Sequence, residues 1–370
     1  MALPFLASCF LISVLLACQK LRISTPPGIG AIIPEDAWSW AMLDLVAQAK
    51  FLTLFALLFG AGLQMLLPRG KQWIQSRLTL LALLGFIHAL FFWDGDILLA
   101  YGLVGLICWR LVRDAPSVKS LFNTGVLLYL VGIGVLLLLG VISNSETSRA
   151  WTPDASALVY EKYWKLNGGM EAISNRAEML SNSLLALGAQ YGWQLAGMML
   201  LGAALMRSGW LKGQYSLRHY RRTGFLLVAL GLTINLPAII LQWRLDWAYR
   251  WCAFLLQAPR ELSAPFQTLG YAALILGYWP QLSRFRLVFA IACVGRMALT
   301  NYLLQTIICT TLFYQFGLFM AFNRLELLFF VVPVWAINLL FSVIWLRFWR
   351  QGPIEWLWRQ FTLRASRTSR

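Results

Sequence analysis

The sequence predicts an all-α polytopic membrane protein with about ten transmembrane helices. Three observations support this fold class. The 370 residues are 59% hydrophobic and only 12% charged, whereas soluble domains carry roughly 25% charged residues. The apolar residues fall in blocks close to the ~20 residues that a helix needs to cross a bilayer. The 18 Trp and 12 Tyr residues suit the two membrane–water interfaces, where amphipathic rings concentrate.

Ten apolar blocks are the predicted spans, and each ends near a charged residue or a proline. Their approximate limits are residues 2–18, 51–67, 78–93, 97–112, 121–142, 190–206, 225–241, 263–280, 298–319 and 325–346. The first block is the weakest, because no basic residue precedes it. A secretory signal would need a positive region there, so we expect a transmembrane helix.

Two connections should contain helices of their own. The longest, residues 143–189, should face the periplasm, with a short helix over Asp154–Leu166. Loops of this length in a compact fold are often functional, and the alternative is a cap over the bundle. Pro34–Lys50 predicts a helix at the surface. Its shared apolar face would carry Trp38, Met42, Leu45 and Val46.

The distribution of basic residues predicts the orientation. After the first connection, one set of alternate connections carries 19 Lys and Arg residues and the other carries 8. The positive-inside rule assigns that side to the cytoplasm, so ten spans place both termini there. A weak division at the basic stretch 207–222 separates an N-terminal six-span half, residues 1–206, from a C-terminal four-span half, residues 207–370.

The C-terminal tail predicts a helix that lies in the inner membrane interface. Gly352 and Pro353 should break the last span. An apolar stripe with helical spacing follows, and it consists of Ile354, Leu357, Trp358 and Phe361. Arg359 and Arg364 lie beside this stripe, as in interfacial amphipathic helices. Anchoring is the expected role, and binding of a partner is the alternative.

Four strings of this sequence resemble the YeiB family of uncharacterised bacterial inner-membrane proteins. They are residues 51–62, 85–105, 295–305 and 352–359, and the resemblance covers about residues 34–364. That family usually opens with an Asp, then Arg-Gly, then small and apolar residues. Residues 1–33 lack this motif, since Ile23 follows Arg22. Either the chain starts at an altered position or its first helix has diverged, and an active site that uses this helix would be impaired.

More distantly, the sequence resembles membrane acyltransferases that pass an acyl group across the bilayer to a sugar or similar acceptor. Those proteins often place a key His near the outer face. The resemblance is one of fold, and it implies a reaction class only by analogy.

His88 is the central candidate for catalysis. It is one of only two His residues, and ionisable residues inside spans are functional candidates because burying them is expensive. Asp94 and Asp96 follow within two turns, with Gly95 allowing a tight turn. A carboxylate would orient the imidazole as a general base or as an acyl carrier. The alternative is a His hydrogen-bonded between helices, with both aspartates in water and capping the next span.

A polar group near the start of the ninth span is the second candidate. Arg296 would hold a phosphate or carboxylate of a cofactor, or it would be a snorkelling anchor at the inner interface. Asn301, Tyr302 and Gln305 share a helical face, which should line a substrate path or bond to other helices.

These residues predict acyl transfer from a cytoplasmic donor, such as acyl-coenzyme A, to an acceptor at the periplasmic face. A transporter of a small or amphipathic solute is the alternative, and a non-catalytic scaffold is a third. The expected partners are the lipid bilayer and a small-molecule or lipid substrate. The net charge is +16, and the basic residues lie between apolar blocks. The sequence has no nucleic-acid-binding motif and no metal-ligand spacing, so we expect the protein to bind neither nucleic acid nor a metal ion.

Overall fold

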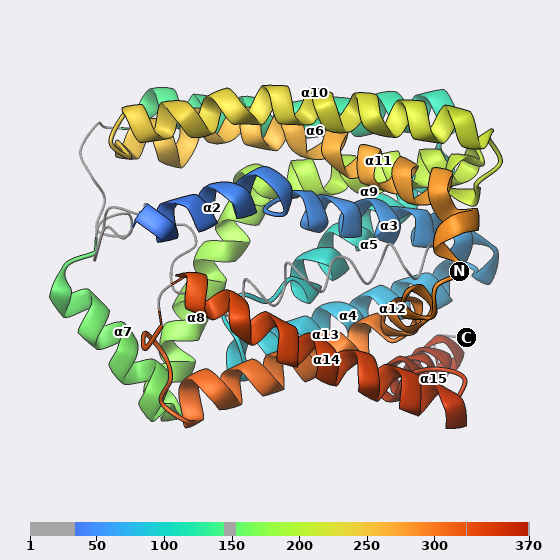
Figure 1. Cartoon of the computed structure of the whole chain (residues 1–370). Helices are drawn as coiled ribbons and strands as arrows, with labels where there is room; N and C mark the ends of the chain where they lie inside the picture. Colours follow the sequence, from blue (N-terminus) through green and yellow to red (C-terminus); the bar gives the residue numbers. More distant parts are fainter. Residues whose placement is uncertain (1–33, 144–152, 323, 369–370) are drawn as a thin grey trace.

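The computed structural model describes residues 34–143, 153–322 and 324–368, and all regular secondary structure in these ranges is helical. The α-helices are α2 (Pro34–Val46), α3 (Lys50–Leu66), α4 (Lys71–Phe91), α5 (Leu98–Asp114), α6 (Val118–Ile142), α7 (Ala155–Asn167), α8 (Gly169–Ala186), α9 (Gly192–Arg207), α10 (Leu217–Arg244), α11 (Gln257–Leu282), α12 (Arg286–Arg296), α13 (Ala298–Thr310), α14 (Arg324–Phe348) and α15 (Pro353–Thr368). In Figure 1, α6, α10 and α11 lie along one side of the molecule and α4 with α12–α15 along the other.

Several of these helices are long and apolar enough to cross a membrane. Within the described residues there are six such stretches, or seven if the bent pair α12–α13 counts as one span. The predicted all-helical membrane-type fold is therefore confirmed, while the count of ten spans stays a prediction. The first predicted span, residues 2–18, lies outside the described part of the chain, as does the segment without the opening motif.

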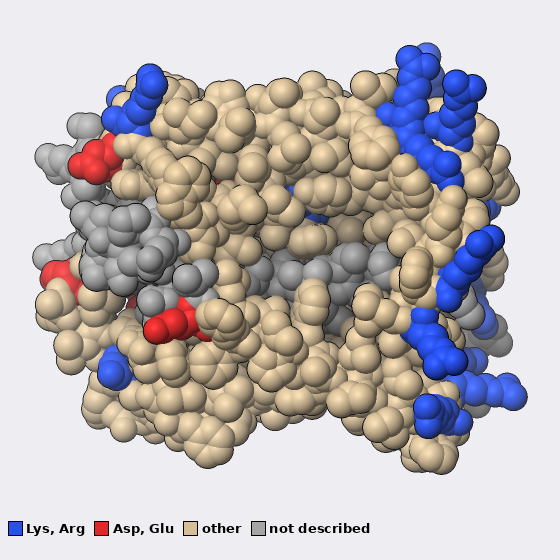
Figure 2. Space-filling model, in the orientation of Figure 1, with Lys and Arg blue, Asp and Glu red and all other residues tan. Residues whose placement is uncertain are grey.

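Charge is segregated along the molecule. Figure 2 shows Lys and Arg gathered mainly at one end of this face, which is the end that holds α15 in Figure 1. We call it the basic end. The segregation agrees with the alternation of basic connections in the sequence, and the assignment of this end to the cytoplasm stays a prediction.

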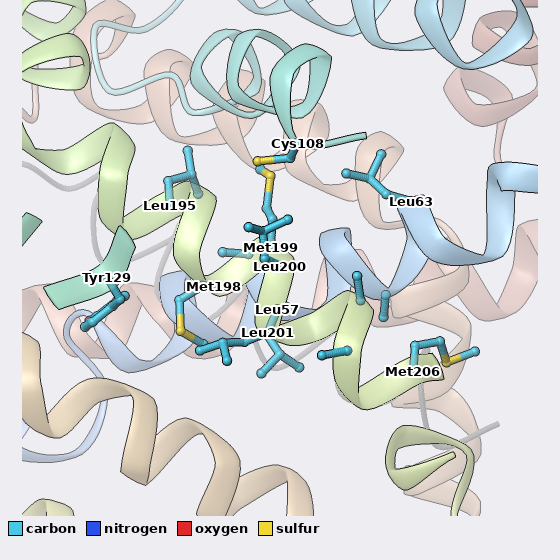
Figure 3. Packing of buried hydrophobic residues seen from close by; sticks show 14 of the residues in the cluster. Leu57, Leu63, Cys108, Tyr129, Leu195, Met198, Met199, Leu200, Leu201 and Met206 are labelled. Carbon is cyan, nitrogen blue, oxygen red and sulfur yellow. The ribbon is translucent and has the colours of Figure 1, made fainter. Parts of the chain in front are cut away.

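Helices α3 and α9 pack closely at the centre of the bundle. A Cβ added at Gly60 would lie 1.8 Å from the carbonyl oxygen of Met199, and one added at Gly202 would lie 1.8 Å from that of Leu57. The two glycines therefore allow the backbones to touch, as small residues do between membrane helices. Figure 3 shows the side chains around this contact. Those labelled from α9 are Leu195, Met198, Met199, Leu200, Leu201 and Met206.

The segment 143–189 contains two helices in its described part. Asp154 caps α7 by accepting a hydrogen bond from the Ala157 N–H at 2.8 Å, so the predicted short helix is confirmed. Helix α8 was not expected. It continues through a π-helical turn, η2 (Leu187–Tyr191), into α9, which gives one helical stretch over Gly169–Arg207. The apolar blocks of the sequence did not predict this helix, because it contains many polar residues. Exposure of this segment to the periplasm stays a prediction.

The predicted helices at the two ends of the described chain are present. The expected face of α2 is solvent- or lipid-exposed, with Trp38 at 63% and Met42 at 62%, because Trp40 and Asp44 occupy the buried face. Helix α15 begins at Pro353 as expected. Only part of its stripe packs on the bundle, since Trp358 donates to the Arg77 carbonyl at 3.0 Å. Interfacial anchoring of α15 stays a prediction.

Candidate functional site

The imidazole of His88 is held at both nitrogens. Its Nδ1 lies 2.8 Å from Oδ1 of Asp96, and its Nε2 lies 3.1 Å from the hydroxyl of Thr306. The side chains of His88 and Asp96 are only 3% and 2% exposed. A carboxylate at this distance fixes the ring orientation and stabilises an imidazolium. The structure therefore brings together two of the three predicted catalytic residues.

The chain between α4 and α5 places this pair. His88 lies in the last turn of α4, and the chain reverses before α5 begins at Leu98. The second oxygen of Asp96, which precedes the N-cap residue Ile97, accepts a hydrogen bond from the Leu99 N–H in the first turn of α5 at 2.9 Å. Gly85 permits the close approach, because a Cβ there would lie 2.1 Å from the Leu99 nitrogen. The same carboxylate thus starts a helix and orients the imidazole.

Helix α13 supplies the other polar groups around the pair. The Tyr302 hydroxyl donates to Oδ1 of Asp96 at 3.1 Å, and the ring lies 5.2 Å from that of His88. Thr306 lies one turn later, 3.2 Å from the Tyr302 carbonyl oxygen. Its single hydroxyl proton goes either to that carbonyl or to Nε2 of His88. The hydroxyl therefore donates to Nε2 or accepts from it, depending on the tautomer of His88.

Asp94 belongs to a different cluster. Its carboxylate lies 3.7 Å from the Nζ of Lys165 on α7, which also lies 3.4 Å from Glu161. The ammonium group of Lys165 is 5.1 Å from the ring of Phe319. Of the two candidate orienting carboxylates, only Asp96 contacts His88. Asp94 instead connects the α4–α5 turn to α7 through an ion pair in which both side chains are buried.

A cavity of about 300 Å³, which we call the central cavity, is lined by Tyr302 but not by His88 or Asp96 themselves. Its wall is mostly apolar and comes from α3, α4, α5, α12, α13 and α15. The residues that matter below are Phe55, Phe59, Arg77, Tyr101, Arg296, Tyr302, Glu355 and Trp358. Each of the four strings that carry the family resemblance contributes to this wall. Strings far apart in the sequence thus converge on one hollow.

The wall of the central cavity also carries polar and charged groups. Tyr302 brings the hydroxyl that contacts Asp96, Arg77 and Arg296 bring two positive charges, and Glu355 brings one negative charge. Arg77 precedes His88 by eleven residues on α4, which corresponds to roughly 16 Å along a helix. Arg296 is exposed and donates to the Arg350 carbonyl at 2.9 Å. An amphipathic molecule with an anionic group is the ligand that such a wall suits.

Asn301 and Gln305 are buried and do not line the central cavity. The Asn301 amide donates to the Val294 and Met297 carbonyls and to the Ser342 hydroxyl. It thereby holds the 87° bend between α12 and α13 and ties it to α14. Gln305 is completely buried on α13. Of the three residues expected along a substrate path, Tyr302 alone is part of that wall.

Sequence reasoning missed several residues around this site. Thr306 follows Tyr302 by one helical turn, so its spacing was a usable signal. Glu355 accepts hydrogen bonds from the Leu299 and Thr300 N–H groups at 2.8 and 3.0 Å and so fixes α15 to the start of α13. Arg77 lies 3.5 Å over the Trp358 ring. From the sequence it was recognised only as one of the basic residues that connect two predicted spans.

The relatives of this chain identify its family. The uncharacterized protein YeiB of Escherichia coli is 81% identical over 356 residues, which are 95% of this chain and 92% of that protein. The chain belongs to the YeiB family. The chain is also similar to the uncharacterized protein YxaH of Bacillus subtilis, which is 32% identical over 88% of this chain and 84% of its own length. A 39.9 kDa protein encoded in the amylase 3′ region of Bacillus acidopullulyticus is 26% identical over 92% and 87%.

A family model described as a protein of unknown function (DUF418) matches residues 205–365. That region of this YeiB-family chain holds Tyr302, Thr306 and Glu355, while His88 and Asp96 precede it. The polar cluster therefore joins the matched region to helices outside it. No solved structure matches the chain significantly.

Proposed function

We propose that this protein transfers an acyl group from a cytoplasmic donor to an acceptor at the opposite face of the membrane. One observation carries the proposal. The wall of one cavity includes both the cationic side chains of Arg77 and Arg296 and the side chain of Tyr302. The Tyr302 hydroxyl contacts the carboxylate that orients His88. The residues that would bind the acyl donor and the residue that would act on the acceptor thus line the same cavity.

The cationic part of the cavity suits the head of an acyl donor. Arg77 and Arg296 would pair with phosphate or carboxylate groups, because guanidinium groups bind these anions with two parallel hydrogen bonds. Phe55, Phe59 and the aliphatic residues of α3 and α4 offer apolar surface to the acyl chain. Acyl-coenzyme A has both features, so it is the donor that we propose.

Tyr302 is the group through which the buried pair acts. The acceptor hydroxyl gives its proton to the Tyr302 oxygen as Tyr302 gives its own proton to the Asp96 carboxylate, which shares it with His88. The acceptor oxygen then forms a bond to the thioester carbon, the carbon–sulfur bond breaks, and the leaving thiolate takes back the proton held by Asp96 and His88 through Tyr302. General acid–base groups of this kind contribute about 10²–10⁴-fold to rates.

Transport of a small or amphipathic solute is the second candidate, and one observation favours it. His88 and Asp96 are almost fully buried between helices, and buried carboxylate–histidine pairs in membrane proteins often relay protons. A transporter would move the solute intact, whereas an acyltransferase breaks a thioester. The fate of the donor therefore separates the two functions.

The test uses inside-out membrane vesicles of a bacterium that expresses the full chain, so that endogenous acceptors are present. Palmitoyl-coenzyme A and acetyl-coenzyme A, each labelled in the acyl group, are added at the cytoplasmic face. We expect labelled acceptor to form, and to fall at least about tenfold with His88→Ala and Tyr302→Phe. His219→Ala is the matched control, because this second His is exposed at the start of α10.

Equal labelling by the wild type and His88→Ala would contradict a role for His88. An absence of labelled product with both donors, at normal protein levels, would contradict acyl transfer from coenzyme A. Uptake of an intact solute that depends on His88 would then favour transport.

A further inference from the structure

A second cavity of about 280 Å³ lies behind Tyr101, whose side chain lines both cavities. It is lined from the ends of α3, α6, α9 and α11 that lie away from the basic end. Its wall is more polar than that of the central cavity. We call it the glutamine cavity, after Gln48, Gln190, Gln194 and Gln257 in its wall. None of the residues that we propose for acyl transfer lines this second cavity.

Two amide atoms of this wall are buried without a protein partner. They are Oε1 of Gln48 and Nε2 of Gln194, neither of which has a hydrogen-bond partner among the described residues. Gln194 is 93% buried, with a relative exposure of 7%. A buried amide that stays unpaired costs about 1–3 kcal/mol. A ligand that both accepts and donates a hydrogen bond would remove this cost.

The hydrogen-bond network fixes which way the Gln194 amide faces. Nε2 of Gln190 donates to the Gly132 carbonyl oxygen at 3.2 Å, and a carbonyl can only accept. The same nitrogen donates to Oε1 of Gln194 at 3.0 Å. The remaining group of Gln194 at the cavity is therefore its NH₂ donor. Gly132 makes room for this arrangement, because a Cβ there would lie 2.6 Å from Cγ of Gln194.

The charged groups of the wall neutralise one another. The Arg260 guanidinium lies 3.1 Å from Glu261 and 3.5 Å from Asp44, and it donates to Gln257 at 2.9 Å. Asp44 also accepts from the Asn235 amide at 3.3 Å. Because Arg260 is already paired with two carboxylates, it has little positive charge left for an anion. The cavity therefore favours an uncharged ligand.

The backbone beside the cavity is irregular. Gln190 lies within η2, the π-helical turn between α8 and α9, and Gln48 precedes Ala49, which has a positive φ of 65°. π-helical turns are frequent at functional sites. In this protein the turn brings Gln190 and Gln194 to one wall.

We propose that the glutamine cavity is a binding site for a small uncharged molecule with several hydroxyl or amide groups, of about monosaccharide size. Ligand pockets span about 300–1,000 Å³, so 280 Å³ suits a small polar molecule better than a lipid. A hydroxyl group satisfies both Gln48 and Gln194, since it donates and accepts. This inference stands apart from acyl transfer, because it concerns binding alone.

Binding is measured directly with the full chain in nanodiscs. The probes are radiolabelled glucose, N-acetylglucosamine and myo-inositol, and glucose 6-phosphate, gluconate and glucosamine serve as charged analogues. We expect at least one uncharged probe to bind, and its charged analogue to bind more weakly. Gln194→Leu should weaken that binding at least about tenfold, which corresponds to the loss of one well-placed hydrogen bond. Gln267→Leu is the matched control, since Gln267 is a completely buried glutamine outside this wall.

A second readout keeps the test informative if Gln194→Leu folds poorly. A cysteine introduced by Gln194→Cys should react with a methanethiosulfonate reagent, and the bound probe should slow the reaction. Native Cys252 should react more slowly, because burial raises the pKa of its thiol to about 11. The proposal is overturned if none of the uncharged probes binds, if a charged analogue binds more tightly, or if Gln267→Leu weakens binding as much as Gln194→Leu does.

Discussion

Asp94 and Asp96 are two residues apart, yet their carboxylates serve different parts of the molecule. Asp96 contacts His88, Tyr302 and the start of α5, whereas Asp94 pairs with Lys165 on α7. The difference arises because the tight turn at Gly95 sends the two side chains to opposite neighbours. This geometry makes their substitutions distinguishable.

We predict that Asp96→Asn lowers the rate of acyl transfer strongly and has a smaller effect on folding. The amide keeps the shape of the side chain but loses the charge that orients His88, so transfer per folded protein should fall by about 10²-fold or more. Asp94→Asn should act on stability instead, lowering the free energy of unfolding by about 1–3 kcal/mol. Transfer rates and thermal unfolding in detergent check both. Equal effects of the two changes on the rate would contradict the assignment.

The pairing of His88 with an aspartate could be predicted from sequence because the two residues are eight positions apart and flank one short turn. The contact with Thr306 could not, since it joins residues 218 positions apart. Likewise, nothing in the sequence distinguished Tyr302, which reaches the central cavity, from Asn301, which holds a bend. Such choices depend on how α12 and α13 meet α14.

At the scale of elements, the close contact between α3 and α9 depends on two glycines, which have no side chain. Gly60 and Gly202 let each backbone reach the other. We predict that Gly60→Ala and Gly202→Ala each destabilise the protein by about 1–3 kcal/mol or more, because a methyl group would overlap a backbone carbonyl. Gly134→Ala on α6 is the control, since its Cβ would meet open space, and it should be neutral or stabilise by about 0.5–1 kcal/mol. Thermal unfolding measures all three. Similar losses in the three variants would argue against this close contact.

Helix α15 is held by one carboxylate at the start of α13. Glu355 accepts from two backbone N–H groups there and from the Thr300 hydroxyl, as anions do at helix N-termini. We predict that Glu355→Ala releases α15. A spin label attached through Gln360→Cys should then become more mobile, while Arg359→Ala on the same helix should leave its spectrum unchanged. An unchanged spectrum in Glu355→Ala would show that other contacts hold α15.

At the scale of the whole molecule, we propose that the basic end marks the cytoplasmic side of the membrane. We predict that a cysteine at Lys162→Cys on α7 reacts with a membrane-impermeant maleimide on intact spheroplasts. One at Lys212→Cys should react only after lysis. Both native residues are exposed lysines, so the pair is matched. Reaction of both cysteines from the same side would contradict the proposed orientation.

Sequence reasoning gave the all-helical class and most helix positions, because apolar blocks of membrane length are strong signals. It was less able to count spans. Helix α5 has only 17 residues, and α11 carries Gln257, Arg260 and Glu261 in its first two turns. The predicted span 298–319 is bent by 87° from α12 and ends in the π-helical turn Thr311–Gln315. The division into halves at 207–222 stays a prediction.

The central claim is that the cavity between Arg77 and Tyr302 holds the acyl chain of the donor. Photolabelling of the protein in nanodiscs with a diazirine palmitoyl-coenzyme A, followed by mass spectrometry, tests it most directly. We predict that the label attaches to cavity residues of α3, α4 or α13, such as Phe55 or Leu81, and that excess palmitoyl-coenzyme A prevents it. Labelling confined to the lipid-exposed surface, or unaffected by the competitor, would contradict the account.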